Sequence, residues 1–285
     1  MTTSKKLLSL TIVSLLILMV VATTGIQAVK ASNAALLFTP NYINGDPSGE
    51  ASYSDSVANM VYYYFYTYGS NYAYTYNCED SAATVSNYMS CLSYAQNNFY
   101  NSVIYSKGHE VPCENGDHYA ILDHTAAYLY DYSDVYDSTG ASDRFVFLWH
   151  CGTAMSYPSD YDSYGWEGMP YCFTHDNSMS TNGYGSGADP GVYVFLGFIE
   201  YSQEYMTGTS YQSYNYGDFV TIFYQYLLEY HYSVSSALDA AAILTLGSTN
   251  FGSSALHTGI WMTGTCGSFW SKMVVYGDGN LGIPS

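Results

Sequence analysis

Two residues whose side chains can carry out covalent chemistry close apolar stretches of the sequence. Cys151 ends the stretch FVFLWHC, which begins at Phe145, and His109 ends the stretch VIYSKGH, which begins at Val103. A cysteine held as thiolate is a strong nucleophile, and an imidazole within hydrogen-bond reach can take the thiol proton and later protonate a leaving amine. The two residues, 42 positions apart, are therefore a candidate dyad for acyl transfer.

Strand-like and helix-like segments alternate along the chain, which predicts a doubly wound α/β fold with a mostly parallel sheet flanked by helices. In such sheets, sites form at the carboxyl ends of strands. Parallel strands joined through a helix, expected within residues 120–143, would place His109 and Cys151 side by side. Each of these residues also has a neighbouring glycine, which lets backbone approach a ligand.

The periodicity and the turn residues predict the following elements. Strands are expected at 35–38, 71–77, 102–110, 144–149, 192–198 and 272–277. Helices are expected at 52–69, 81–98, about 125–132, and as a pair within 216–244 that is broken near Tyr232 and Ser233. A hairpin is expected around Asn115 and Gly116, and a glycine-rich loop from 152 to 191.

Taken singly, each candidate has a structural interpretation. A cysteine at a strand end is usually a core residue or half of a disulfide, and a histidine near a hairpin is usually a surface group. Their occurrence at consecutive strand ends favours a functional interpretation. His150 is a rival base, but adjacent strand residues point to opposite faces, so we expect His150 to face away from Cys151.

The N-terminal segment has the layout of a secretory signal. Lys5 and Lys6 precede a long apolar run, and Val29-Lys30-Ala31 is a plausible cleavage site. We therefore expect a signal peptide at 1–31, a single α/β domain at 32–285, and a location outside the cell or on its surface. An uncleaved N-terminal membrane anchor is the alternative, because the run is slightly long for a signal and slightly short for a span.

Acidic residues dominate the charge of the chain. The formal net charge is -18, and it becomes -21 without residues 1–31, which hold three of the six basic residues and no acidic one. Nucleic acid is an improbable partner for such a chain, because phosphate binding needs Lys and Arg. No cofactor is expected. The negative potential favours cationic polypeptide substrates.

Six cysteines in an exported chain favour disulfides. With Cys151 free, we expect Cys113 to pair with Cys172, since the hairpin after His109 and the loop after Cys151 should border one cleft. The weaker second pair is Cys78 with Cys91.

Metal binding is the alternative role for the other polar clusters. His109, His118, His124 and Cys113 match no standard zinc spacing, so no metal is expected there. Asp131, Asp134 and Asp137 lack an ordered calcium loop, which favours a solvated acidic face.

The sequence resembles the caspase-fold cysteine peptidases, and within them the gingipain-like branch. The resemblance rests on VIYSKGHE, on FVFLWHCGTA, on the strand VYVFLGF, on the late helix pair, and on the closing stretch KMVVYGDGNLGI. Together these segments cover roughly residues 100–283. The resemblance implies a caspase-like three-layer sandwich and a cysteine endopeptidase.

The resemblance also implies roles for individual residues. Cys151 would be the nucleophile and His109 the base, with the backbone N–H of Cys151 as one oxyanion donor. In the family a glycine usually follows the histidine and offers the second donor. Here that position is Glu110, with Gly108 on the other side of His109. We therefore expect the Glu110 side chain to disturb the oxyanion hole.

Two expectations about function follow from these residues. Cleavage after Lys or Arg is expected from the negative charge, with Asp117, Asp123 and Asp189 as candidate acids of the specificity pocket. The alternative function is that of a catalytically silent cell-surface or extracellular matrix protein that keeps the fold for binding, as Glu110 and the 35 tyrosines allow.

Overall fold

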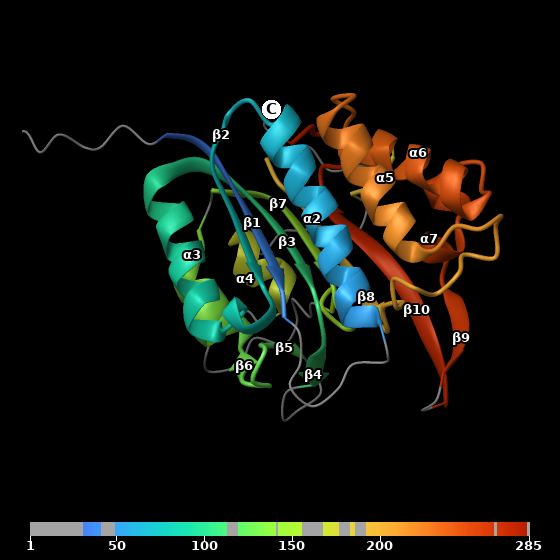
Figure 1. Cartoon of the computed structure of the whole chain (residues 1–285), viewed down its shortest axis with the longest axis horizontal. Helices are drawn as coiled ribbons and strands as arrows, with labels where there is room; N and C mark the ends of the chain where they lie inside the picture. Colours follow the sequence, from blue (N-terminus) through green and yellow to red (C-terminus); the bar gives the residue numbers. More distant parts are fainter. Residues whose placement is uncertain are drawn as a thin grey trace, which may run out of the picture. The chain divides into compact units, whose positions relative to one another are not determined.

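The computed structural model contains a seven-stranded, mostly parallel sheet (Figure 1). It describes residues 31–40, 49–112, 119–140, 142–155, 168–176, 183–185, 192–264 and 267–283. The strands of the sheet are β1 (Ala31–Thr39), β2 (Tyr72–Glu79), β3 (Phe99–Lys107), β7 (Asp143–Trp149), β8 (Val194–Glu200), β9 (Ile260–Gly264) and β10 (Gly267–Gly277). Their order is β2-β1-β3-β7-β8-β10-β9. Strand β10 is antiparallel to both of its neighbours, β8 and β9, and the other four pairs are parallel. The predicted fold class is confirmed.

The central strands are apolar on both faces because a core lies on each side of the sheet. In β7, Phe145, Phe147 and Trp149 belong to one core, whereas Val146 and Leu148 belong to the other. This alternation follows from the two-residue period of a strand. A strand that is buried on both faces therefore reads as a continuous apolar run.

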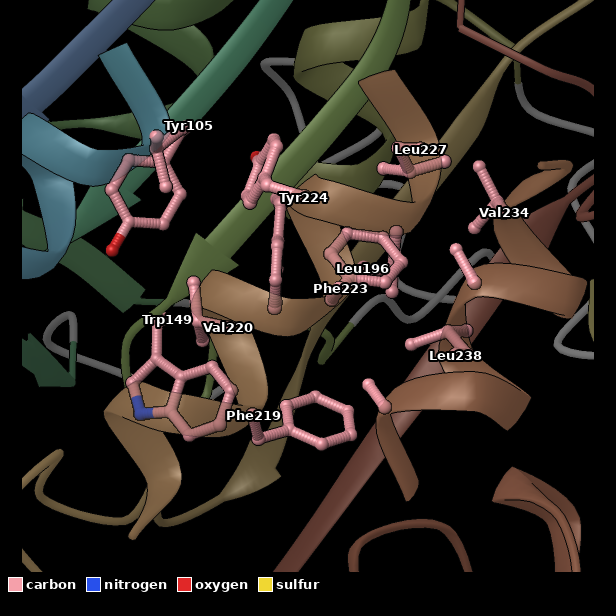
Figure 2. Close-up of a cluster of buried hydrophobic side chains, with 14 of the residues drawn as sticks. Tyr105, Trp149, Leu196, Phe219, Val220, Phe223, Tyr224, Leu227, Val234 and Leu238 are labelled. Atoms are coloured by element: carbon pink, nitrogen blue, oxygen red, sulfur yellow. The ribbon is translucent and has the colours of Figure 1, made fainter. Parts of the chain in front are cut away.

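Helices cover both faces of the sheet. The first core is covered by α2 (Glu50–Tyr68), α5 (Tyr216–Leu228) and α6 (Val234–Leu246), and the second by α3 (Val85–Asn98) and α4 (Met169–Thr174). Figure 2 shows the first core, where aromatic side chains of α5 approach Tyr105 and Trp149 of the sheet. Such aromatic packing explains part of the high aromatic content.

Local signals set the ends of the late helices. Asn215 and Asp218 form a capping box at the start of α5, and the Ser233 hydroxyl accepts the N–H of Ser236 at the start of α6. Gly247 ends α6 in the left-handed conformation that favours glycine. The predicted break near Tyr232 and Ser233 is confirmed.

The predicted helix at 125–132 is wrong. The carboxylate of Asp123 accepts the N–H groups of Thr125 and Ala127, which makes a tight turn in place of a helix. The segment continues as a short strand, and a π-helix (Asp131–Tyr136) begins only after it. The strands β4 (Glu110–Pro112), β5 (Tyr119–Leu122) and β6 (Tyr128–Leu129) form a second, antiparallel sheet.

Other predicted boundaries agree only in part. The strands on both sides of the predicted hairpin pair as expected, while Asn115 and Gly116 lie outside the described residues. The predicted loop 152–191 contains α4, and β9 was not predicted. Three further helical turns complete the described chain: the 3-10 helices Asp80–Ala82 and Phe251–Ser253, and α7 (Ala255–Thr258).

The predicted signal segment lies outside the described residues, except for Ala31, which is the first residue of β1. Within the part of the chain that the structure describes, no helix is both long and apolar enough to cross a membrane.

A buried carboxyl group at the amino end of β7 should make stability depend on pH. Asp143 is almost fully buried, its Oδ1 accepts the hydroxyl of Ser102, and its Oδ2 has no hydrogen-bond partner among the described residues. Burial raises the pKa of Asp143 to about 7, although the Ser102 hydrogen bond opposes the shift. The folded state therefore holds a proton that the unfolded chain releases near pH 4.

We therefore expect the free energy of unfolding to fall as the pH rises from about 4 through about 7. Between about pH 4 and 7, Asp143 should account for a fall in the free energy of unfolding on the order of 4 kcal/mol, and Asp143→Asn should remove this fall. Urea unfolding at a series of pH values measures the change, with the exposed Asp137→Asn as the control. Parallel slopes for the wild type and Asp143→Asn would contradict the assignment.

Candidate active site

The two predicted strand ends lie side by side. Strands β3 and β7 are parallel neighbours, and Lys107 pairs with Trp149 at their carboxyl ends. His109 and Cys151 each follow two residues later, so the two chains leave the sheet in matching register. The predicted parallel pairing of these two strands is confirmed by the register, and a contact between the His109 imidazole and the Cys151 sulfur stays a prediction.

A third strand end completes the surroundings of Cys151. Ser202 follows β8, its backbone N–H donates to Cys151 Sγ at 3.1 Å, and its Oγ lies 3.6 Å from the same sulfur. Sequence reasoning did not single out Ser202. The rule that sites gather at the carboxyl ends of neighbouring strands would have pointed to it, because β8 is the next strand of the sheet.

The Glu110 side chain already accepts the hydrogen bond of the Cys151 backbone N–H, the group that was expected to bind the oxyanion. The N–H of Cys151 donates to Glu110 Oε2 at 2.8 Å. Burial raises the pKa of Glu110 to about 7, while this hydrogen bond and the positive charges of His109 and Lys107 act in the opposite direction. The Glu110 side chain thus disturbs the expected oxyanion hole by binding its donor, the N–H of Cys151.

The Cys151 thiol is protonated in this arrangement. Cys151 is partly buried, and burial together with the charge of Glu110 raises the pKa of the thiol to about 12. The hydrogen bonds from Ser202 and the charge of Lys107 oppose the shift without cancelling it. A nucleophilic step at this sulfur therefore needs a base that removes the proton as the new bond forms.

The two histidines next to the site differ in environment. His109 is exposed, and its carbonyl oxygen accepts the N–H of Leu122 at 3.0 Å. His150 is fully buried, with Nδ1 3.2 Å from that same carbonyl and Nε2 2.8 Å from the hydroxyl of Ser106. Burial lowers the pKa of His150 to about 3. His150 is thus a neutral structural group, and His109 is the histidine available to solvent.

A buried ion pair fixes the segment that carries Ser202. Lys107 Nζ lies 3.4 Å from Glu50 Oε1, and the Glu50 carboxylate also accepts the N–H groups of Tyr205 and Met206, at 2.7 and 3.1 Å. The indole N–H of Trp149 donates to the carbonyl of Gln203 at 2.6 Å. The start of α2 is thereby bound to the end of β3 through the Glu50–Lys107 ion pair. The segment between β8 and α5 is bound to Glu50 and to Trp149 at the end of β7.

The candidate specificity acids are not part of this cluster. Asp123 is buried and accepts hydrogen bonds from Val85, Thr125 and Ala127, so its role is structural and its assignment to a pocket was wrong. Burial acts to raise its pKa, but these hydrogen bonds outweigh it and hold the pKa below the usual value. Asp117 and Asp189 lie outside the described residues.

The predicted disulfides have two outcomes. Cys78 and Cys91 carry free thiols, so the second predicted pair is wrong. The Cys78 thiol donates instead to the carbonyl of Ala82 at 2.8 Å. Cys172 lies on α4 and is fully buried in the second core. Its predicted partner Cys113 lies outside the described residues, so that pair stays a prediction.

The aspartates in and directly after the π-helix, Asp131, Asp134 and Asp137, do not form a solvated face throughout. Asp131 is buried and accepts the N–H groups of Tyr132 and Gly168, which corrects the prediction for this residue. Asp134 accepts the N–H of Tyr130, and Asp137 is exposed. Among the described residues, no group of three or more His, Cys, Asp or Glu is arranged to hold a metal ion.

Comparison with known proteins adds no relative. No protein-family model matches the sequence, and no curated protein is significantly similar to it. What the site can do is therefore inferred from its own residues and from the fold that holds them.

Proposed function

We propose that this chain is a secreted cysteine-type endopeptidase in which Cys151 is the nucleophile and His109 the base. The observation that carries the proposal is the matching register at the ends of β3 and β7, which brings a thiol and a solvent-exposed imidazole to one edge of a parallel sheet. The resemblance of the two strand ends to those of caspase-fold peptidases of the gingipain-like branch also supports it. The substrate class is polypeptide.

The reaction assigns one task to each group. Cys151 Sγ attacks the scissile carbonyl carbon while His109 takes the thiol proton, and His109 then protonates the departing amine, which leaves an acyl-enzyme for water to hydrolyse. The N–H of Cys151 is the nearest donor for the oxyanion. The N–H of Gly152 is already donated to the carbonyl of Glu200, so it offers no second donor in this arrangement.

We expect cleavage after Lys or Arg. The net charge of -18 attracts cationic substrates, and the chain's own basic residues outside the N-terminal segment are protected. Lys107 is buried, and Arg144 and Lys272 lie within β7 and β10. A fluorogenic peptide library should give a kcat/KM about tenfold higher for basic residues before the cut bond, and this preference should shrink as salt is added.

The specificity test has a clear opposite outcome. A preference for Asp, Asn or apolar residues before the cut bond, unaffected by salt, would contradict the expected specificity and leave the dyad in place. Hydrolysis of no peptide by the wild type at any pH between 4 and 9 would contradict the endopeptidase itself.

The second candidate function is a catalytically silent binding protein at the cell surface or in the extracellular matrix. Two observations favour it. The N–H of Cys151 is already bonded to Glu110, and the thiol pKa of about 12 is far from that of an activated nucleophile. Reactivity of Cys151 toward a peptidyl electrophile separates the two functions, because only the peptidase needs the sulfur to attack a bound carbonyl.

A further inference from the structure

We propose that Glu110 is a built-in inhibitor of the Cys151 site, which closes the site by accepting the backbone N–H that an oxyanion needs. The inference rests on the proposed function, since it concerns the regulation of the same site. The carboxylate oxygen lies 2.8 Å from the nitrogen of Cys151. It thus stands where the negatively charged oxygen of a tetrahedral intermediate would have to bind.

The contact can open by movement of one side chain. The backbone of Glu110 is fixed, because Glu110 pairs with Ile121 in the small sheet and the preceding carbonyl accepts the N–H of Leu122. The turn that carries Cys151 is held by its own hydrogen bonds, since the N–H of Gly152 donates to the carbonyl of Glu200 and the hydroxyl of Thr153 donates to the carbonyl of His150. Rotation of the Glu110 side chain away from Cys151 would therefore free the donor without rearranging either strand end.

The charges around Glu110 indicate what releases it. Its own segment brings the positive charges of His109 and Lys107, although Lys107 is paired with Glu50. The end of β7 brings Cys151 and the neutral His150, and β5 places the apolar Ile121 opposite Glu110. Burial outweighs the cations and holds the pKa of Glu110 at about 7. Protonation of the Glu110 carboxylate below about pH 7 therefore weakens its hydrogen bond with the N–H of Cys151.

Two variants and one control separate the effect of the Glu110 charge on the Cys151 thiol from the hydrogen bond that Glu110 accepts from the Cys151 N–H. Glu110→Gln removes the charge but keeps an oxygen that can accept the N–H, whereas Glu110→Ala removes both. Glu204→Ala is the matched control, because Glu204 is an exposed acid in the same segment as Ser202. A peptide aldehyde probes the N–H, since its adduct with Cys151 carries an oxygen that needs this donor, and iodoacetamide probes the thiol alone.

We expect both Glu110 variants to be alkylated by iodoacetamide at pH 8 about tenfold faster than the wild type, because the loss of the neighbouring charge lowers the thiol pKa. Aldehyde affinity should rise about tenfold or more in Glu110→Ala and less in Glu110→Gln. Glu204→Ala should match the wild type in both measurements. As the pH falls from 8 to 6, the wild type and Glu110→Gln should converge in aldehyde affinity.

The outcomes distinguish this inference from the proposed function. Aldehyde affinity in Glu110→Ala at or below the wild-type value would overturn the role of Glu110 as inhibitor. Unchanged alkylation in both variants would overturn its effect on the thiol. Faster alkylation in the Glu110 variants, with no aldehyde binding or peptide hydrolysis by any of them, would instead overturn the endopeptidase and leave Glu110 as a group that controls the thiol.

Discussion

Replacing Cys151 with alanine is expected to lower peptide hydrolysis by at least about 10⁴-fold, because the attacking sulfur is lost. His109→Ala should lower kcat/KM by about 100- to 10,000-fold, because a thiol with a pKa of about 12 depends on a base during attack. Circular dichroism and thermal unfolding should show the fold retained in both variants, since Cys151 is only partly buried and His109 is exposed. Initial rates with a cleaved fluorogenic peptide measure the effect.

Two control variants test whether these losses are specific. Cys91→Ala removes a free, partly buried thiol on α3, and His231→Asn changes an exposed histidine between α5 and α6. Both should keep the wild-type rate within about twofold, since neither residue is near the strand ends. Full activity in Cys151→Ser and Cys151→Ala alike would remove Cys151 from the mechanism.

Breaking the buried ion pair should cause the largest loss of stability. Glu50 and Lys107 are both buried, and Glu50→Gln leaves the Lys107 ammonium without its counter-charge. We expect Glu50→Gln and Lys107→Met each to lower the free energy of unfolding by about 3–5 kcal/mol, the usual cost of an uncompensated buried charge. Urea unfolding at pH 7 measures the change.

The double variant makes this test specific to the pair. Glu50→Gln with Lys107→Met should cost less than the two single changes added together, because no unpaired charge remains. Lys272→Met, a basic residue on β10, is the control and should change the free energy of unfolding by less than about 1 kcal/mol. Additive losses, or losses below about 1 kcal/mol in both single variants, would contradict a coupled pair.

The sheet could be predicted from the sequence because its strands are buried on both faces. Runs such as Phe145–Trp149 are apolar throughout, which is typical of strands buried on both faces. The helix predicted at 125–132 failed for a local reason. The predicted helix does not form there, because the Asp123 carboxylate holds the backbone in a turn.

Part of the site was also predictable. His109 and Cys151 end strands of similar composition, so their juxtaposition follows from a parallel pairing whose register hydrophobic burial fixes. The network that supports them was not predictable, because Glu50 acts on Tyr205 and Met206 across more than 150 positions of sequence. The orientation of the Glu110 side chain toward the N–H of Cys151 likewise depends on the packing of two separate sheets.

The most direct test of the proposed function is covalent labelling with a peptidyl acyloxymethyl ketone, followed by peptide mapping of the modified residue. The wild type should carry one label per chain, on Cys151, and His109→Ala should label at least about 100-fold more slowly. The same reagent should not modify Cys78, Cys91 or Cys172 in the folded protein. Two results would contradict a peptidase that uses Cys151 as its nucleophile. One is a ketone label confined to the other three cysteines, and the other is a Cys151 that iodoacetamide alkylates but the ketone does not modify.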